Sequence, residues 1–133
     1  MFIHGLGGTL DFWKPLISST KLKDDYQCTV FDFEGHGASP TSPLSKLSID
    51  SLANDVHSVF SHLGIQPGAT LFAHSLGCLI ALRFALNNPG LIKKLVLLGP
   101  PPQPSPESRK QRMTCSRGAG TQQRHGCRGR CSS

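Results

Sequence analysis

The abrupt loss of large apolar residues after residue 102 limits what this chain can fold into more than any other feature. Residues 103–133 contain no Val, Ile, Leu, Phe, Tyr or Trp. Such a segment cannot bury enough apolar surface to offset the entropy lost on ordering, so we predict that it is disordered. A proline-rich run over 100–106 marks the boundary. The sequence therefore predicts one ordered segment, 1–102, followed by a tail over 103–133 that is Pro-rich and then Arg-rich.

The net charge of +6 comes entirely from the tail. Residues 1–106 hold seven Lys or Arg and seven Asp or Glu, whereas residues 107–133 hold seven Lys or Arg and only one Glu. An ordered segment without net charge has no electrostatic reason to bind nucleic acid, so no specific nucleic-acid partner is predicted. A weaker hypothesis is polyanion binding by the tail, which lacks aromatic residues to stack on bases.

The apolar runs and the cysteines of the sequence indicate in which cellular compartment the protein is found. No apolar run reaches the roughly 18 residues that a membrane span needs, and the first residues do not form a signal peptide. Cys28 and Cys78 lie singly in apolar elements and are predicted to be buried, reduced thiols. Nothing indicates a disulfide framework, so we expect a reducing, cytoplasmic location. Four tail residues could be considered as zinc ligands: Cys115, His125, Cys127 and Cys131. Only the spacing between Cys127 and Cys131 fits a zinc site, so no metal is predicted.

Residues 1–102 alternate between strand-like and helical patterns. Thr9 and Ser48 are placed to cap two of the helices, and Gly64 to end the second. Strands that alternate with helices imply parallel pairing through right-handed crossovers. The predicted fold class is therefore α/β, with a mostly parallel sheet of about four strands and flanking helices. We expect strands over 2–4, 28–33, 70–73 and 95–98, and helices over 10–17, 49–63 and 76–86.

The sequence Phe-Ala-His-Ser-Leu-Gly at 72–77 lies where a predicted strand turns into a predicted helix. A serine in such a tight turn presents its Oγ above the end of the sheet. The N-terminus of the following helix favours a developing negative charge beside Ser75. Small residues at 73 and 77 let the backbones approach closely. The alternative interpretation is a serine that caps an apolar helix and does no chemistry.

A second glycine-rich turn, His-Gly-Leu-Gly-Gly at 4–8, follows the first predicted strand. Its glycines permit backbone shapes that direct an N–H group at a carbonyl oxygen. Alone, this segment is typical of an ordinary turn. Paired with the serine turn farther along the chain, it is predicted to supply the other half of an oxyanion hole.

Together, HGLGG at 4–8, DFEGHGAS at 32–39, AHSLG at 73–77 and KKLVLLGPPP at 93–102 resemble the α/β-hydrolase family. The resemblance covers about residues 1–102, as the N-terminal part of the domain, and is greatest to the esterase and lactonase branch, which includes 3-oxoadipate enol-lactonase. It implies Ser75 as the nucleophile and the backbone N–H groups of Leu6 and Leu76 as the oxyanion-hole donors. It also implies a small-molecule ester or lactone substrate and no metal or organic cofactor. The oligomeric state is not predicted.

The resemblance also implies supporting residues and a strand order. His4 is expected to hydrogen bond to the glycine turn, and His74 to shape the pocket. Gly5 and Gly77 support the two turns. The first strand is expected between the second and the third, with the fourth outside the third. Of the other histidines, one belongs to the turn after the second strand and two are exposed on a helix: His36, His57 and His62.

The remaining members of a catalytic triad are missing from the ordered segment. In this family an acid and a histidine follow the serine on later loops. Here the only candidates are Glu107 and His125, both in the tail, where no scaffold holds them near Ser75. No triad acid or histidine is identified, so the resemblance describes a truncated domain. Two hypotheses remain: a serine hydrolase of an ester, lactone or similar acyl bond, and a catalytically inactive hydrolase fragment. Glu34 stands where the family usually carries Arg, and no role is predicted for it.

Overall fold

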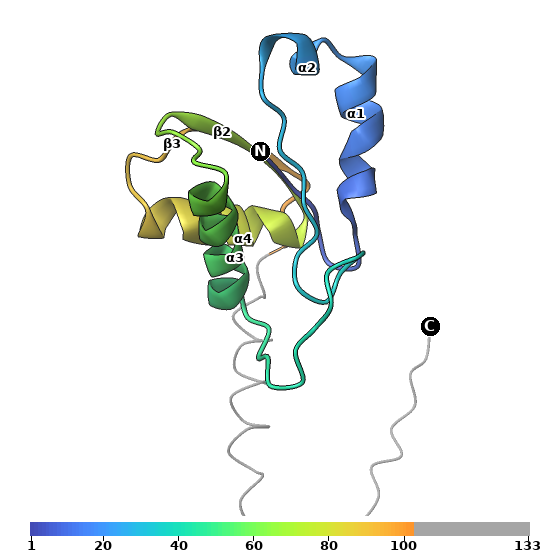
Figure 1. The fold of residues 1–133 in the computed structure, drawn as a ribbon, viewed down its shortest axis with the longest axis vertical. Coiled ribbons are helices and arrows are strands. Elements are labelled where there is room, and N and C mark those ends of the chain that lie inside the picture. The colour runs from blue at the N-terminus through green and yellow to red at the C-terminus, as the bar shows by residue number, and fades with distance from the viewer. Residues whose placement is uncertain (103–133) are drawn as a thin grey trace, which may run out of the picture. The chain divides into compact units, whose positions relative to one another are not determined.

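The computed structural model describes residues 1–102. The predictions for the tail, including those for Glu107 and His125, the zinc site and polyanion binding, lie outside these residues. The elements in chain order (Figure 1) are β1 (Phe2–Ile3), the 3-10 helix η1 (Leu10–Trp13), α1 (Lys14–Ser19), α2 (Leu22–Asp25), α3 (Ile49–His62), β2 (Ala69–His74), α4 (Leu76–Asn87) and β3 (Ile92–Leu98).

The three strands form one parallel sheet in the order β1-β2-β3. Beyond β1, Val30 forms a single parallel bridge with Phe2. The predicted α/β class is confirmed, as is the order that places the first strand between the second segment and the third. The strand predicted over 28–33 is wrong, because β1 offers only two residues to pair with. Cys28 is accordingly only half-buried, whereas Cys78 is buried as predicted, and both are free thiols.

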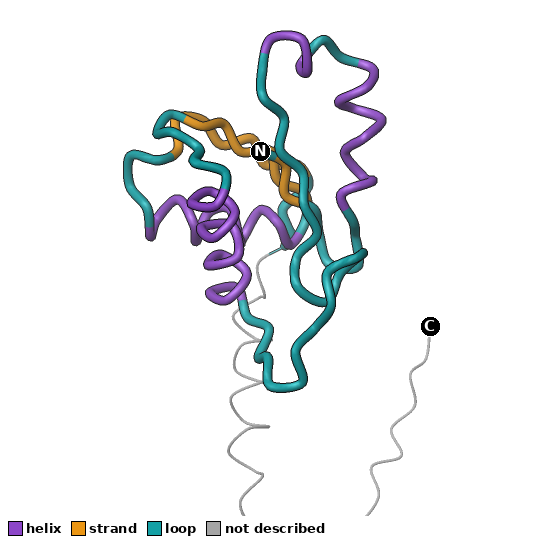
Figure 2. The backbone as a smooth tube through the Cα atoms, viewed as in Figure 1, coloured by secondary structure: helices purple, strands orange, loops and turns teal. Residues whose placement is uncertain are grey.

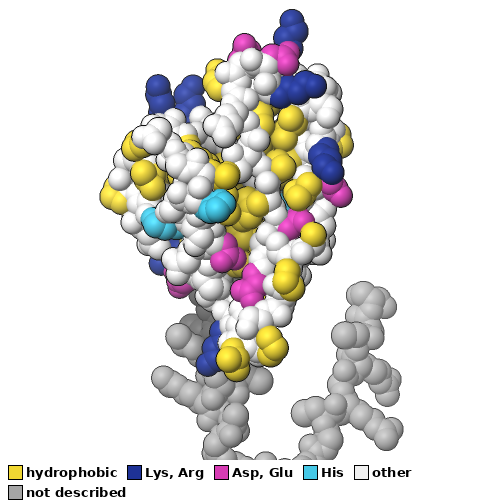
Figure 3. Space-filling view, viewed as in Figure 1, with side chains coloured by type: hydrophobic (Ala, Val, Ile, Leu, Met, Phe, Trp, Pro, Cys, Tyr) yellow, Lys and Arg dark blue, Asp and Glu magenta, His cyan; other side chains and the backbone are white. Residues whose placement is uncertain are grey.

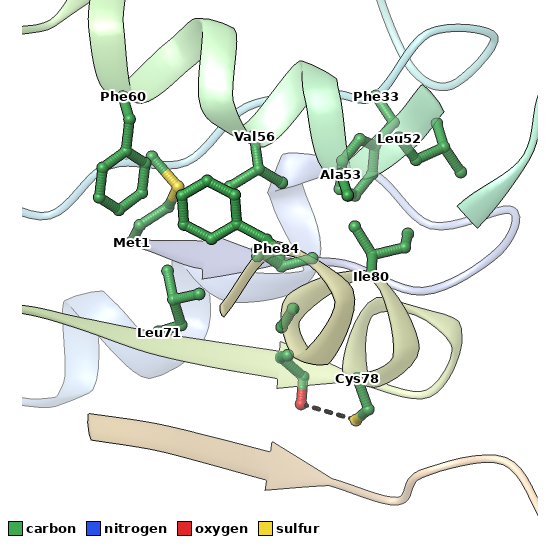
Figure 4. Packing of buried hydrophobic residues seen from close by; sticks show 13 residues of the cluster. Met1, Phe33, Leu52, Ala53, Val56, Phe60, Leu71, Cys78, Ile80 and Phe84 are labelled. Carbon is green, nitrogen blue, oxygen red and sulfur yellow. Dashed lines mark hydrogen bonds between the residues drawn. The ribbon is translucent and has the colours of Figure 1, made fainter. Parts of the chain in front are cut away.

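The α3–α4 pair covers one face of the sheet (Figure 2). Side chains alternate along a strand, and Leu71 and Ala73 of β2 point into this face with no exposed surface. The apolar periodicity of the two helices predicts this packing. The resulting core (Figure 4) consists of Met1, Ile3, Phe33, Leu52, Ala53, Val56, Phe60, Leu71, Ala73, Cys78, Ile80, Ala81 and Phe84.

The predicted helix caps are present. Ser48 Oγ accepts a hydrogen bond from Ser51 N at 3.0 Å, and Ser51 Oγ accepts one from Ser48 N at 2.8 Å. This reciprocal capping box fixes the start of α3. Gly64, with a φ of 60°, follows the end of the helix. Thr9 Oγ1 accepts from Asp11 N at the start of η1.

Aromatic side chains hold η1 against the other face of the sheet. Phe2 stacks on Phe72 with ring centroids 5.0 Å apart, and Trp13 lies 5.3 Å from Phe2. Trp13 is only 2% exposed, so it anchors η1 and the turn before it.

One face of the described part carries charged side chains of both signs. Acidic and basic side chains both occur on the face shown in Figure 3. No helix within residues 1–102 is both long enough and apolar enough to pass through a membrane.

Candidate active site

Ser75 joins β2 to α4 with a backbone conformation that L-amino acids rarely adopt. Its φ is 51° and its ψ is −122°, and it is the one non-glycine residue with positive φ within residues 1–102. This ψ lies outside the left-handed helical region, so the turn is strained. Ser75 N donates to Leu98 O at 3.0 Å, and Ser75 O accepts from Cys78 N at 2.9 Å. These bonds hold the strained turn between β3 and α4.

The Ser75 side chain does not cap α4. A capping serine accepts a hydrogen bond from an N–H group of the first helical turn. Ser75 occupies the N-cap position but makes no such bond. The helix-cap interpretation of this serine therefore finds no support in the geometry.

Two glycines allow the close contacts around this turn. A Cβ atom on Gly77 would lie 2.6 Å from His4 O and 2.8 Å from Ile3 O. A Cβ atom on Gly5 would lie 3.0 Å from Ser75 Cβ. The first contact brings α4 against β1, and the second brings the 4–8 turn against Ser75. The two motifs that lie far apart in the sequence thus meet at the carboxyl ends of β1 and β2.

The 4–8 turn is held by His4, which is 1% exposed. Phe33 N donates to His4 Nε2 at 3.3 Å, so Nε2 accepts and the proton is on Nδ1. Nδ1–H then donates to Gly5 O at 2.8 Å. Gly8 N donates to the same carbonyl at 3.0 Å, which closes the turn.

Asp32 connects the same region to η1. Its Oδ1 accepts from Leu10 N at 2.6 Å and its Oδ2 from Ala38 N at 3.1 Å. Burial raises the pKa of Asp32, but these two hydrogen bonds outweigh it and hold the pKa below its usual value. The carboxylate therefore stays ionised and braces the loops on both sides of the 4–8 turn.

His4 is expected to make the chain less stable at mildly acidic pH. Burial lowers its pKa, although the hydrogen bond to Gly5 offsets part of the effect. The groups facing it are Asp32, 4.0 Å from Nε2, and His36, whose ring centroid is 5.2 Å away. Because the unfolded chain takes up the proton first, the contribution of His4 is complete above its ordinary pKa of about 6.5. It is lost as the pH falls from there through the lowered pKa of the folded state.

Urea unfolding as a function of pH would measure this effect. A His4→Gln variant should lose the decline in stability just below about pH 6.5. A His57→Gln variant, changed at an exposed position on α3, should keep it. An unchanged slope in His4→Gln would contradict the assignment. Asp32 affects stability only at lower pH. Its contribution to folding stability is complete above about pH 3.9, the ordinary pKa of an aspartate.

His74 lies beside Ser75, and among residues 1–102 its ring packs against another aromatic ring. Its ring stacks on Phe12, with centroids 4.5 Å apart and an angle of 24° between the planes. Leu6 follows Gly5 in the turn and is 76% exposed. Leu76 is the first residue of α4, so its N–H has no acceptor within the helix. The structure thus gathers His4, Gly5, Leu6, His74, Ser75, Leu76 and Gly77 into one region.

No general base for Ser75 is formed by the described side chains. His4 is bonded within the 4–8 and 32–33 backbone, and His36 Nδ1 lies 3.0 Å from Glu34 O. His57 and His62 are exposed on α3, as predicted. Within residues 1–102, none of these histidine hydrogen bonds leads to Ser75.

Sequence reasoning missed three residues near this region. Phe12 stacks on His74, and Asp32 braces two loops. Glu34 accepts from Ser42 N at 3.0 Å and from Ser45 Oγ at 2.8 Å, which together lower its pKa and hold the 42–45 turn. Asp32 and Glu34 lie in the DFEGHGAS motif at 32–39, which drew attention to this segment without indicating what either carboxylate binds.

Comparison with known proteins agrees with this geometry. The family model of the alpha/beta hydrolase fold matches residues 1–121. "Probable lysophospholipase BODYGUARD 4" of Arabidopsis thaliana is 34% identical over 109 aligned positions, and the match covers 79% of this chain and 25% of the plant protein. RutD of Stutzerimonas stutzeri is 35% identical over 104 residues, 78% of this chain and 38% of RutD. A solved esterase from Thermogutta terrifontis is 26% identical, with a TM-score of 0.71 over 87% of this chain and 42% of its own.

A parallel sheet with a strained serine between a strand and a helix defines the general class. The chain belongs to the α/β-hydrolase fold family, a family of hydrolases. It spans between 22% and 38% of the length of the first curated relatives that it matches.

Proposed function

We propose that this chain is part of a serine hydrolase in which Ser75 attacks the carbonyl carbon of a carboxylic ester, lactone or similar acyl bond. The observation that carries the proposal is the strained backbone of Ser75 combined with the absence of a capping bond from its side chain. Strain of this kind persists only where the surroundings impose it, and it is concentrated at functional sites. The family membership supports the same chemistry.

The oxyanion formed in this attack would be bound by two backbone N–H groups. Leu76 offers an N–H at the positive end of α4, and Leu6 offers one from the turn that packs on Ser75. His4 and Gly5 position this turn, and Gly77 allows α4 to approach it. These contacts support the assignment of both donors.

Several broader assignments accompany the proposal. Residues 1–102 would be the N-terminal part of a hydrolase domain related to the esterase and lactonase branch, and residues 103–133 would lie outside it. The substrate would be a small molecule, with no specific nucleic-acid partner. The free thiols of Cys28 and Cys78 favour a cytoplasmic location.

The second candidate is a catalytically inactive fragment. It is favoured by one observation, that no histidine within residues 1–102 is bonded to Ser75. A serine hydroxyl needs a positioned general base to become an effective nucleophile. Such a fragment would keep the backbone geometry of the family around Ser75 but would not hydrolyse a substrate.

Labelling of the full chain with a fluorophosphonate, read by intact mass, separates the two candidates. A single adduct that is lost in Ser75→Ala is expected if Ser75 is activated. Ser58→Ala is the matched control, because Ser58 is an exposed serine whose Oγ donates to Asn54 O on α3. Absence of an adduct, under conditions that label a complete esterase of the family, would establish the inactive fragment instead.

A further inference from the structure

We propose that Phe12, His74 and Leu98 form an acyl wall, a surface beside Ser75 that binds the uncharged apolar chain of an ester substrate. The inference rests on the proposed function and names its substrate class. The preferred substrates would be esters of apolar carboxylic acids rather than esters that carry a second carboxylate.

The three side chains are neighbours because of the sheet register. His74 of β2 pairs with Leu98 of β3, and paired residues on parallel strands present their side chains on the same face. Phe12 stacks on the His74 ring from η1. The acyl wall therefore runs from η1 across the carboxyl ends of β2 and β3. Ser75 directly follows His74, and its N–H is bonded to Leu98 O.

The acyl wall leaves apolar surface in water next to the reactive group. Phe12 is 50% exposed and Leu98 is 41% exposed. Single exposed apolar residues are ordinary, and Leu86 and Leu44 are examples elsewhere in this chain. What distinguishes Phe12 and Leu98 is that they flank one ring beside the strained serine. An apolar ligand segment placed there would remove this surface from water.

Nearby charges do not favour an anionic substrate. Lys14, close to Phe12 in the chain, is paired with Asp11 at 2.5 Å. Lys93 and Lys94 lie toward the opposite end of β3 from Leu98, about 13–17 Å away along the strand. A second carboxylate on the substrate would therefore lose hydration at the acyl wall without gaining a cation from residues 1–102.

Ligand titration of the full chain carrying Ser75→Ala tests the proposal without turnover. Trp13 is the only tryptophan, and its ring lies 5.0 Å from that of Phe12, so its fluorescence reports on the acyl wall. The two probes are methyl hexanoate and the monomethyl ester of hexanedioic acid, which differ by a terminal carboxylate. We expect methyl hexanoate to bind at least about tenfold more tightly.

Variants then locate the binding surface. Phe12→Ala should weaken methyl hexanoate binding by about tenfold, because it removes the exposed half of the ring, which is the surface that the ligand would cover. Phe12→Leu should keep affinity within about threefold. Leu98→Ser provides a second test if circular dichroism shows that Phe12→Ala does not fold. Leu86→Ser, at a 77% exposed position near the end of α4, should change nothing.

The outcomes keep this inference separate from the proposed function. Equal binding of the two probes, no fluorescence response, or unchanged affinity in Phe12→Ala and Leu98→Ser would overturn the acyl wall. Selective binding without fluorophosphonate labelling would uphold the acyl wall and remove the catalytic role of Ser75. Fluorophosphonate labelling of Ser75 together with equal binding of both probes would uphold the catalytic role of Ser75 and overturn the acyl wall.

Discussion

A Gly77→Ala variant is expected to lose about 3 kcal/mol of folding stability, or to fail to fold. The added Cβ would lie 2.6 Å from His4 O and 2.8 Å from Ile3 O, and both are backbone atoms of the sheet. Neither can move without shifting α4 away from β1. Urea unfolding followed by circular dichroism measures the change.

Gly64→Ala separates this steric effect from the general cost of replacing glycine. Gly64 has a φ of 60°, but a Cβ there would meet nothing within 4 Å. Its replacement should cost about 1 kcal/mol through backbone strain alone. Equal losses in the two variants would show that the α4–β1 contact does not require glycine.

Phe84→Ala is expected to destabilise the chain by about 3–5 kcal/mol. Phe84 is fully buried, and its ring centroid lies 4.9 Å from that of Phe60, so this contact joins α4 to α3. Removing the ring leaves a cavity that two crossing helices cannot fill by small movements. The change would be measured by thermal or urea unfolding at neutral pH.

Leu86→Ala is the control for that substitution. It lies on the same helix, but the side chain is 77% exposed. Its effect should stay within about 0.5 kcal/mol. A loss in Phe84→Ala as small as this would mean that the α3–α4 contact is not the main source of stability.

Local patterns were enough to predict most of the elements. The apolar stripe of α3 and the cap at Ser48 defined that helix, and α4 ends at Asn87, one residue beyond the predicted bound. The glycine and serine turns could also be paired from the sequence, because both follow a strand of one parallel sheet. Their mutual contact depends on glycines at 5 and 77, which the resemblance had already singled out.

The failures have physical causes that local sequence does not show. The apolar run over 28–33 has the composition of a strand, but pairing is limited by the length of β1. The helix α2 has only four residues, too few for a helical period to be visible. The bonds of Glu34 to Ser42 and Ser45 join residues eight and eleven positions apart in an irregular segment. No periodicity predicts such a bond.

The outer edge of β3 affects how fast molecules of this chain associate in solution. Within residues 1–102, no strand pairs with that edge, although β3 is seven residues long. An open edge of this length is a template for a strand from another molecule. Pairing of that kind is second order in protein, so its rate rises with the square of the concentration. Dilution should therefore suppress this edge pairing more effectively than cooling, which weakens the apolar contacts of the core.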